Sequence, residues 1–164
     1  MSPILELEFH QFAALQQPNN RDIHNALATC YLKILQESNQ ELGSKKREIR
    51  TSFNQFLISS DFYSKEAVLS LLPDSFYHER AIVLGKLGRH SEALDIYLTD
   101  IDDFESALEY CNRFYNSKDD SVNDIYTRLF RLIIKTRDEE DLDLLKFVEV
   151  YADKLDYRIV SIFE

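Results

Sequence analysis

The sequence predicts an all-α protein, an α-solenoid in which helical hairpins stack on one another. Two observations carry this prediction. The chain of 164 residues contains three glycines and three prolines, too few for the turns that connect the strands of a sandwich or a barrel. Apolar residues also recur at helical spacing, in consecutive segments separated by short polar turns. Antiparallel helices joined by such turns form bundles or stacked arrays.

The first two predicted helices cover residues 4–15 and 21–37. The second has the clearer pattern, because its apolar side chains recur every three or four residues along one stripe. A proline precedes it, followed by Asn19 and Asn20. Because asparagine is a favoured residue at a helix N-cap, we expect one of these two to cap the second helix.

A turn at residues 38–44 is predicted next, because this segment is polar and contains Gly43. The apolar positions 49, 53, 56 and 57 then indicate a third helix. A fourth helix at residues 64–72 is expected to end at Pro73, which has no amide hydrogen to donate to a continuing helix.

The fifth predicted helix covers residues 76–87, and we expect Asp74 or Ser75 to cap it. A tight turn at Gly88 leads into the next helix, over residues 92–97. In the last third of the chain, Asp102 with Glu105 has the spacing of a capping box.

The capping box predicts a helix to residue 115, and the apolar pattern predicts another helix over 122–133. A polar turn at 116–120 separates the two. Thr136–Glu139 has the spacing of a second capping box, which would open a helix reaching residue 155. Residues 157–164 begin one more helix, and they contain no glycine or proline to end it.

Length and composition indicate one domain-sized piece of a packed protein, since about 100–200 residues make a domain. We expect residues 1–164 to form a single α-solenoid segment, truncated at its C-terminal end and also at its N-terminal end.

The formal net charge of −10 disfavours nucleic acid and a polybasic membrane anchor as partners. No apolar run approaches the roughly 20 residues that cross a bilayer. Two cysteines within amphipathic patterns suit a reducing cytosol.

The turn between the fifth and sixth predicted helices has a spacing with a physical explanation. Gly88 ends one helix where a left-handed backbone favours glycine. Ala93 is small where two helices must approach closely, and Tyr97 lies on the same face four residues later. This order is typical of the corner of a tetratricopeptide repeat. The predicted repeat-turn residues are Leu84, Leu87, Gly88, His90, Ala93 and Tyr97.

The segment from Phe76 to Tyr97, followed by Ala107 to Cys111, resembles the clathrin-type helical repeats of endolysosomal tethering subunits. These are the vacuolar sorting proteins of the HOPS and CORVET complexes, in the vacuolar-morphogenesis and TGF-β-receptor-associated-protein branch. Further similar stretches lie in the same order at residues 22–32, 56–63 and 124–129. The turn motif is shared by many repeat proteins, whereas this ordered set is far more specific.

The resemblance implies a place in the C-terminal half of that family's solenoid. Its members also carry a β-propeller and a zinc-binding segment, but this sequence has neither blade repeats nor a Cys-x-x-Cys pair. The implied function is a non-catalytic scaffold that mediates protein–protein assembly in vesicle docking and fusion. The implied location is the cytosolic face of endosome and vacuole (lysosome) membranes.

The implied partners are other subunits of a HOPS- or CORVET-type complex, with Rab GTPase contact expected mainly through other parts of the parent protein. The alternative is an adaptor that binds a small GTPase or cargo in a solenoid groove. In either case we expect no cofactor, no nucleic acid and no direct membrane insertion.

Candidate chemical motifs fail on spacing. His78–Glu79 begins like a zinc-protease motif, but Ile82 stands where the second histidine is required. A calcium loop starting at Asp100 would place Glu105 where glycine is needed. Gly85–Lys86 is followed by leucine instead of the serine or threonine of a phosphate-binding loop.

Two further groups are interpreted as structural. Cys30 and Cys111 have no basic neighbour in the sequence that would lower a thiol pKa, so we expect small core residues. Lys45–Arg47 with Arg50 is the one dense basic patch, and we expect it to be a solvated helix start. The sequence therefore predicts no enzyme and no catalytic, cofactor-binding or metal-binding residues.

Overall fold

Every regular element that the structure, a computed structural model, describes in residues 2–37, 43–116, 124–136 and 142–155 is helical. The predicted all-α fold class is therefore confirmed, and it is consistent with a helical solenoid. The repeat type stays a prediction. The chain divides into two compact units, the N-terminal unit Met1–Gly88 and the C-terminal unit Arg89–Glu164.

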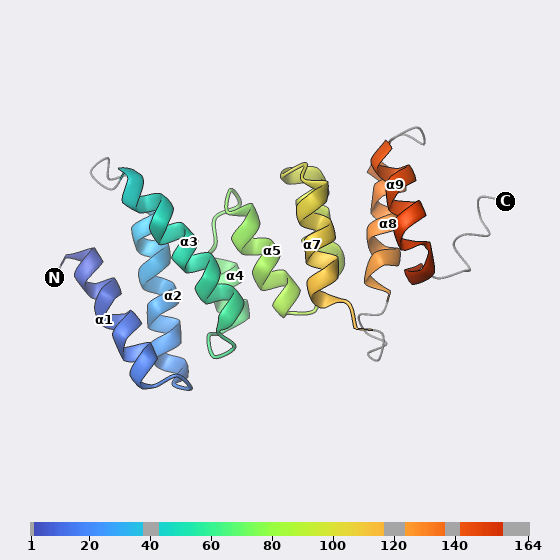
Figure 1. Cartoon of the computed structure of the whole chain (residues 1–164). Coiled ribbons are helices and arrows are strands. Elements are labelled where there is room, and N and C mark those ends of the chain that lie inside the picture. Colours follow the sequence, from blue (N-terminus) through green and yellow to red (C-terminus); the bar gives the residue numbers. More distant parts are fainter. Residues whose placement is uncertain (1, 38–42, 117–123, 137–141, 156–164) are drawn as a thin grey trace. The chain divides into compact units, whose positions relative to one another are not determined.

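The N-terminal unit is built from five helices in its described part. They are α1 (Pro3–Gln16), α2 (Arg21–Gln36), α3 (Gly43–Ser59), α4 (Lys65–Leu71) and α5 (Tyr77–Lys86). Helix α2 packs against α1, α3 and α4, and α5 packs against α3 and α4 (Figure 1). The core between them is apolar and includes Leu27, Ile34, Phe53, Leu57 and Val83. Helices α2, α3 and α5 thus bury apolar residues of the stripes that their sequence patterns predict.

The start of α2 confirms the predicted asparagine cap. The Asn20 side-chain oxygen accepts hydrogen bonds from the amides of Asp22 and Ile23, at 3.1 and 3.3 Å. At α3 the expectation was partly wrong, because Gly43 begins the helix instead of lying in a turn. Residues 38–42 of that predicted turn lie outside the described residues.

The predicted cap of α5 was wrong. Its N-cap is Phe76, and neither Asp74 nor Ser75 takes that position. The Phe76 amide donates to the Pro73 carbonyl at 3.0 Å, so a backbone turn at the proline leads into the helix. Asp74 instead forms an ion pair with Arg80 at 3.7 Å.

The C-terminal unit centres on one helix, α8, in the part of it that the structure describes. Its elements are α6 (His90–Asp95), a π-helix (Ile96–Asp100), α7 (Phe104–Phe114), α8 (Ile125–Thr136), α9 (Leu142–Tyr151) and a 3₁₀ turn (Ala152–Lys154). Helices α6, α7 and α9 and the π-helix all pack against α8. The fully buried side chains here include Leu94, Ala107, Cys111, Ile125, Leu129 and Ile133.

The helix predicted over 92–97 continues to Asp100 as a π-helix. The Ile101 amide donates to the Ile96 carbonyl at 3.0 Å, a bond that spans five residues. Asp102 then takes a left-handed φ of 52°. Because an N-cap needs an extended backbone, the cap of α7 is Asp103, not the predicted Asp102. The Asp103 side chain accepts from the Ser106 amide at 3.0 Å.

Several late predictions fall partly outside the described residues. Helix α8 begins at Ile125, and Val122 is not described. Thr136 is the last residue of α8, while Glu139 and the helix predicted at 157–164 are not described.

The described end of the C-terminal unit is held by three tyrosines around one lysine. The Lys154 ammonium lies 5.3, 4.8 and 5.2 Å from the ring centroids of Tyr115, Tyr126 and Tyr151. An ammonium within about 6 Å of an aromatic face is attracted by the negative potential of the ring. These contacts fasten the 3₁₀ turn to α8 and to the ends of α7 and α9.

Candidate interaction site

The predicted repeat-turn residues fall into both units, three in each. Leu84 is buried in α5, Leu87 is the C-cap of that helix, and Gly88 follows with a φ of 74°. The left-handed backbone expected at Gly88 is therefore present. A Cβ built on Gly88 would meet nothing within 4 Å. The backbone conformation, and not a lack of space, is what favours glycine at this position.

The other three residues are buried in the C-terminal unit. Ala93 is fully buried and Tyr97 nearly so, as close packing around α6 requires. The His90 Nδ1 shares a hydrogen bond of 2.7 Å with the Tyr110 hydroxyl, and its ring lies against Phe114. Burial lowers the pKa of His90 and raises that of Tyr110. Both groups are therefore neutral packing residues at pH 7.

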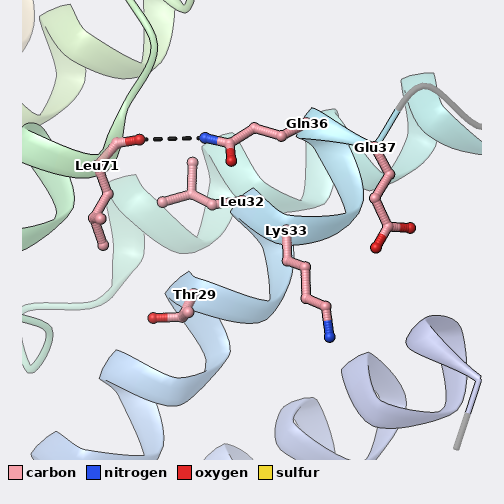
Figure 2. A pocket seen from close by; sticks show the side chains of 6 residues that line it. All are labelled: Thr29, Leu32, Lys33, Gln36, Glu37 and Leu71. Carbon is pink, nitrogen blue, oxygen red and sulfur yellow. Dashed lines mark hydrogen bonds between the residues drawn. The ribbon is translucent and has the colours of Figure 1, made fainter.

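A surface groove of about 430 Å³ lies between α2 and α4. It is lined by Thr29, Leu32, Lys33, Gln36, Glu37 and Leu71 (Figure 2). The Gln36 side-chain amide donates to the Leu71 carbonyl at 3.3 Å and closes one edge. The groove is open, since the Lys33 side chain is 58% exposed and Leu71 is 53% exposed. Its mixed lining suits contact with another protein surface better than enclosure of a small molecule.

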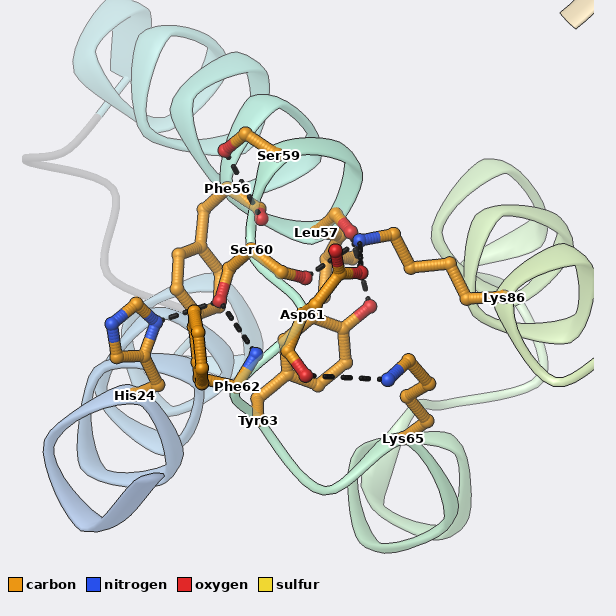
Figure 3. Close-up of polar contacts among 10 residues, drawn as sticks. All are labelled: His24, Phe56, Leu57, Ser59, Ser60, Asp61, Phe62, Tyr63, Lys65 and Lys86. Carbon is orange, nitrogen blue, oxygen red and sulfur yellow. Dashed lines mark hydrogen bonds and ion pairs between the residues drawn. The ribbon is translucent and has the colours of Figure 1, made fainter. Parts of the chain in front are cut away.

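The connection from α3 to α4, residues 60–64, forms a corner that side-chain hydrogen bonds hold in place (Figure 3). The Lys86 ammonium, from α5, donates to the Ser60 carbonyl at 2.6 Å and to the Asp61 carboxylate at 2.9 Å. The hydrogen bond from Lys86 lowers the pKa of Asp61. The buried Tyr63 hydroxyl donates to the Leu57 carbonyl at 3.0 Å. Lys86, which the sequence placed in a failed phosphate motif, thus holds α5 to this corner.

The same corner contains a serine–histidine pair that sequence reasoning did not find. The Ser60 hydroxyl and His24 Nδ1 are 2.7 Å apart, and Ser60 Oγ also accepts from the Phe62 amide at 3.3 Å. His24 Nε2 is buried and has no partner in the part of the chain that the structure describes. A catalytic pair needs a third group that orients the histidine and an opening for substrate. Both side chains are buried, so the pair is structural.

A buried carboxylate joins α3 to α5. Glu79 is fully buried, and both its oxygens accept from the Arg50 guanidinium at 2.6 and 2.8 Å. The Arg50 guanidinium also lies 4.7 Å from the Phe76 ring centroid. The hydrogen bond to Glu79 raises the pKa of Arg50. Lys45 and Arg47 are exposed near the start of α3, as expected for a solvated helix start. Arg50 is 42% exposed, and its charge in addition compensates the Glu79 carboxylate, which the sequence did not predict.

The two thiols are buried, as their apolar positions predicted. Burial raises the pKa of both Cys30 and Cys111, so neither thiol is a thiolate at pH 7. Within the described ranges, no group of three or more histidine, cysteine, aspartate or glutamate residues could hold a metal ion. The same ranges contain no helix that is both long enough and apolar enough to span a membrane.

Helix α1 has a second apolar side, which we call its outer face. The outer face consists of Leu5, Phe9, Phe12 and Leu15, which are 55–78% exposed. The sequence predicted α1 only from a weaker helical pattern, and apolar residues on more than one side of the helix are the signal that marks the outer face. The outer face and the α2–α4 groove are the open surfaces on which a partner could be recognised.

Comparison with curated proteins finds several relatives of this chain. A 101-residue stretch, 61% of the chain, is 36% identical to the vacuolar protein sorting-associated protein 39 homolog of Caenorhabditis elegans. A 141-residue stretch, 82% of the chain, is 32% identical to vacuolar morphogenesis protein 6 of Schizosaccharomyces pombe. A 94-residue stretch, 55% of the chain, is 33% identical to human transforming growth factor-beta receptor-associated protein 1.

In each case the match covers a small part of the relative, between 10% and 15% of its length. No family model matches the chain, and no solved structure does. The resemblance that the ordered sequence segments indicated is confirmed by these relatives.

Proposed function

Because the chain is a relative of the Vam6/Vps39 branch of vacuolar sorting proteins, we propose that it is a scaffold segment of a membrane-tethering subunit. The complex would be of the HOPS or CORVET type, and the segment would mediate protein–protein assembly in vesicle docking and fusion. The observation that carries the proposal is a match of 32% identity over 82% of an all-helical chain.

The structure supports a mechanism based on shape. Stacked helices hold binding surfaces at fixed separation when their contacts are rigid. In the N-terminal unit, the Arg50–Glu79 pair fixes α3 against α5, and Lys86 fixes α5 against the corner at Ser60 and Asp61. Polar contacts of this kind favour one arrangement of neighbouring helices where one partner is buried, as Glu79 is and as Lys86 largely is, because the buried group requires its partner.

The same proposal excludes catalysis and places the segment on the cytosolic side of endosome or vacuole membranes, attached through partner subunits. The side chains that could act as nucleophiles or bases, namely the Ser60–His24 pair and the two thiols, are buried and serve packing. Partners would be other subunits of the same complex.

A second candidate function is an adaptor that binds a small GTPase or cargo. The open groove between α2 and α4 favours it, because a volume of about 430 Å³ can take one or two side chains of a partner. Nucleotide-dependent binding would be the distinguishing property of this alternative.

We expect the purified chain to be retained by at least one core subunit of a HOPS- or CORVET-type complex. The experiment is co-purification of the tagged chain with each core subunit in turn, beside a late-endosomal Rab in both nucleotide states. Retention by a core subunit without nucleotide dependence supports the scaffold. Binding only to the GTP-bound Rab supports the adaptor, and retention by none of them contradicts both.

A further inference from the structure

We infer that His90 is a pH switch in the C-terminal unit. Protonation of its buried ring places an uncompensated positive charge in the core that joins α6 to α7, so that the unit loses stability in mild acid. Three features of the structure carry this inference, namely the burial of the ring, its hydrogen bond and the charges around it. The switch goes beyond the proposed assembly function and does not depend on it.

The His90 ring is enclosed by aromatic side chains. It is 5% exposed, and its centroid lies 5.1 Å from that of Phe114 and 6.0 Å from that of Tyr110. Tyr97 of the π-helix packs on Tyr110 in turn, with centroids 5.7 Å apart. An imidazolium ion in such surroundings loses most of its hydration, and aromatic rings replace only part of that loss. The neutral form of His90 therefore fits this core better than the charged form.

The hydrogen bond between His90 Nδ1 and the Tyr110 hydroxyl, 2.7 Å long, also suits a neutral ring. A neutral imidazole has one nitrogen that donates and one that accepts, so the hydroxyl can pair with Nδ1 in either direction. In the protonated ring Nδ1 can only donate, and the tyrosine proton then has no acceptor in this ring. Tyr110 cannot supply a balancing negative charge, because burial raises the pKa of its hydroxyl.

The charged side chains at the start of α8 that act on His90 largely cancel one another. The Arg128 guanidinium and the Asp124 carboxylate form an ion pair at 3.0 Å. Burial is the main reason that the pKa of His90 lies below its ordinary value, Arg128 lowers this pKa further, and Asp124 raises it. Since the carboxylate is already paired, it is a poor partner for an imidazolium ion.

The titratable groups on the other neighbouring elements offer no compensation either. Tyr110 of α7 and Tyr97 of the π-helix are phenols, which carry no charge near neutral pH. On α6 itself, the Glu92 carboxylate accepts from the Arg89 guanidinium at 2.6 Å. His90 is also the first residue of α6, where the partial positive charge of a helix N-terminus disfavours a cation.

These features set the direction of the pH dependence. In the unfolded chain His90 regains its ordinary pKa of about 6.5, so near and below that pH the unfolded state binds the proton more readily than the folded state. The stability contributed by neutral His90 is complete above about pH 6.5 and is lost as the pH falls through the lower, folded pKa. At most one proton is taken up, so the unfolding equilibrium constant rises by up to about tenfold per pH unit.

The test compares the opening of the C-terminal unit at about pH 7.5 and about pH 5.5, a window that brackets the ordinary histidine pKa. The proteins are the wild-type chain, His90→Gln, and the matched control His78→Gln, which removes an exposed histidine of α5. Glutamine keeps a donor and an acceptor near Tyr110 but takes up no proton. Hydrogen exchange at the Ala93 and Ala107 amides, which donate to backbone carbonyls, measures the opening equilibrium.

We expect acidification to raise the opening constant of the wild type and of His78→Gln by a larger factor than that of His90→Gln. The difference should reach up to about tenfold per pH unit, the limit for one proton. Each protein is compared with itself at the two pH values, so packing lost in His90→Gln at neutral pH does not enter the result. Equal acid dependence in the wild type and His90→Gln would overturn the inference.

A second measurement needs no variant. An NMR titration of the His90 ring in the wild-type chain should have its midpoint below the ordinary histidine pKa, because the folded core disfavours the charged ring. A midpoint at or above the ordinary value would overturn the inference, and it would do so even where His90→Gln fails to fold.

Discussion

At the scale of single residues, Gly88 shows how one backbone angle requires one residue type. Its φ is 74°, and a Cβ at this position would meet no atom within 4 Å. A β-branched side chain is therefore penalised only through the backbone. We expect Gly88→Val to lower the free energy of unfolding by about 1–2 kcal/mol, measured by urea denaturation.

Gly43 provides the matched control for this substitution. It also has open space around its Cβ, but it begins α3 without a positive φ. Gly43→Val should cause no loss of stability, since valine is a better helix residue than glycine. Equal losses for Gly43→Val and Gly88→Val would contradict the assignment of the cost to the left-handed backbone.

At the scale of elements, the Arg50–Glu79 pair decides how α3 meets α5. Glu79 is fully buried, whereas the Arg50 side chain is 42% exposed. Arg50→Ala therefore leaves a buried carboxylate without compensation, and we expect a loss of about 2–4 kcal/mol. Glu79→Gln should cost less, because the guanidinium that loses its partner can still reach water. Chemical denaturation of both variants measures the difference.

The double variant Arg50→Met with Glu79→Leu separates the ion pair from the packing of α3 on α5. It removes both charges and keeps much of the apolar volume, so it should recover part of the stability lost in Arg50→Ala. A double variant less stable than Arg50→Ala would contradict this explanation, as would a larger loss for Glu79→Gln than for Arg50→Ala.

At the scale of the whole molecule, the chain contains two compact units, and the first has its own core. We expect residues 1–88 alone to fold, because the Arg50–Glu79, Lys86–Asp61 and His24–Ser60 contacts all lie inside this unit. Circular dichroism and thermal unfolding would measure helix content and cooperativity. Shortening the piece to residues 1–73 removes α5 and should lower its melting temperature, since Glu79 and Lys86 are lost.

A non-cooperative, unstructured fragment 1–88 would show that the unit depends on the rest of the chain. In a solenoid each repeat is stabilised mainly by its nearest neighbours. The expectation of a single solenoid segment over residues 1–164 stays a prediction.

The order and type of the helices could be predicted from the sequence, as the Asn20 cap and the end of α4 before Pro73 illustrate. These features depend on neighbours within a few residues. The predicted caps at Asp74 and Asp102 failed, since a proline turn and a left-handed backbone leave each aspartate unable to cap. Of the candidate site, the sequence predicted the left-handed backbone at Gly88 but not which residues form the outer face of α1. That the six turn residues form a repeat stays a prediction.

By itself, the sequence determined that the chain is helical, where most helices lie and which proteins it is related to. The first two follow from periodicity and from residues close to one another in the chain, and the third rests on the resemblance of several ordered segments to a known family. Only the tertiary structure decided that Arg50 compensates Glu79, that Lys86 holds the corner at Asp61 and that α1 exposes one apolar side. Each of these depends on which helices become neighbours in space, and local spacing does not encode that choice.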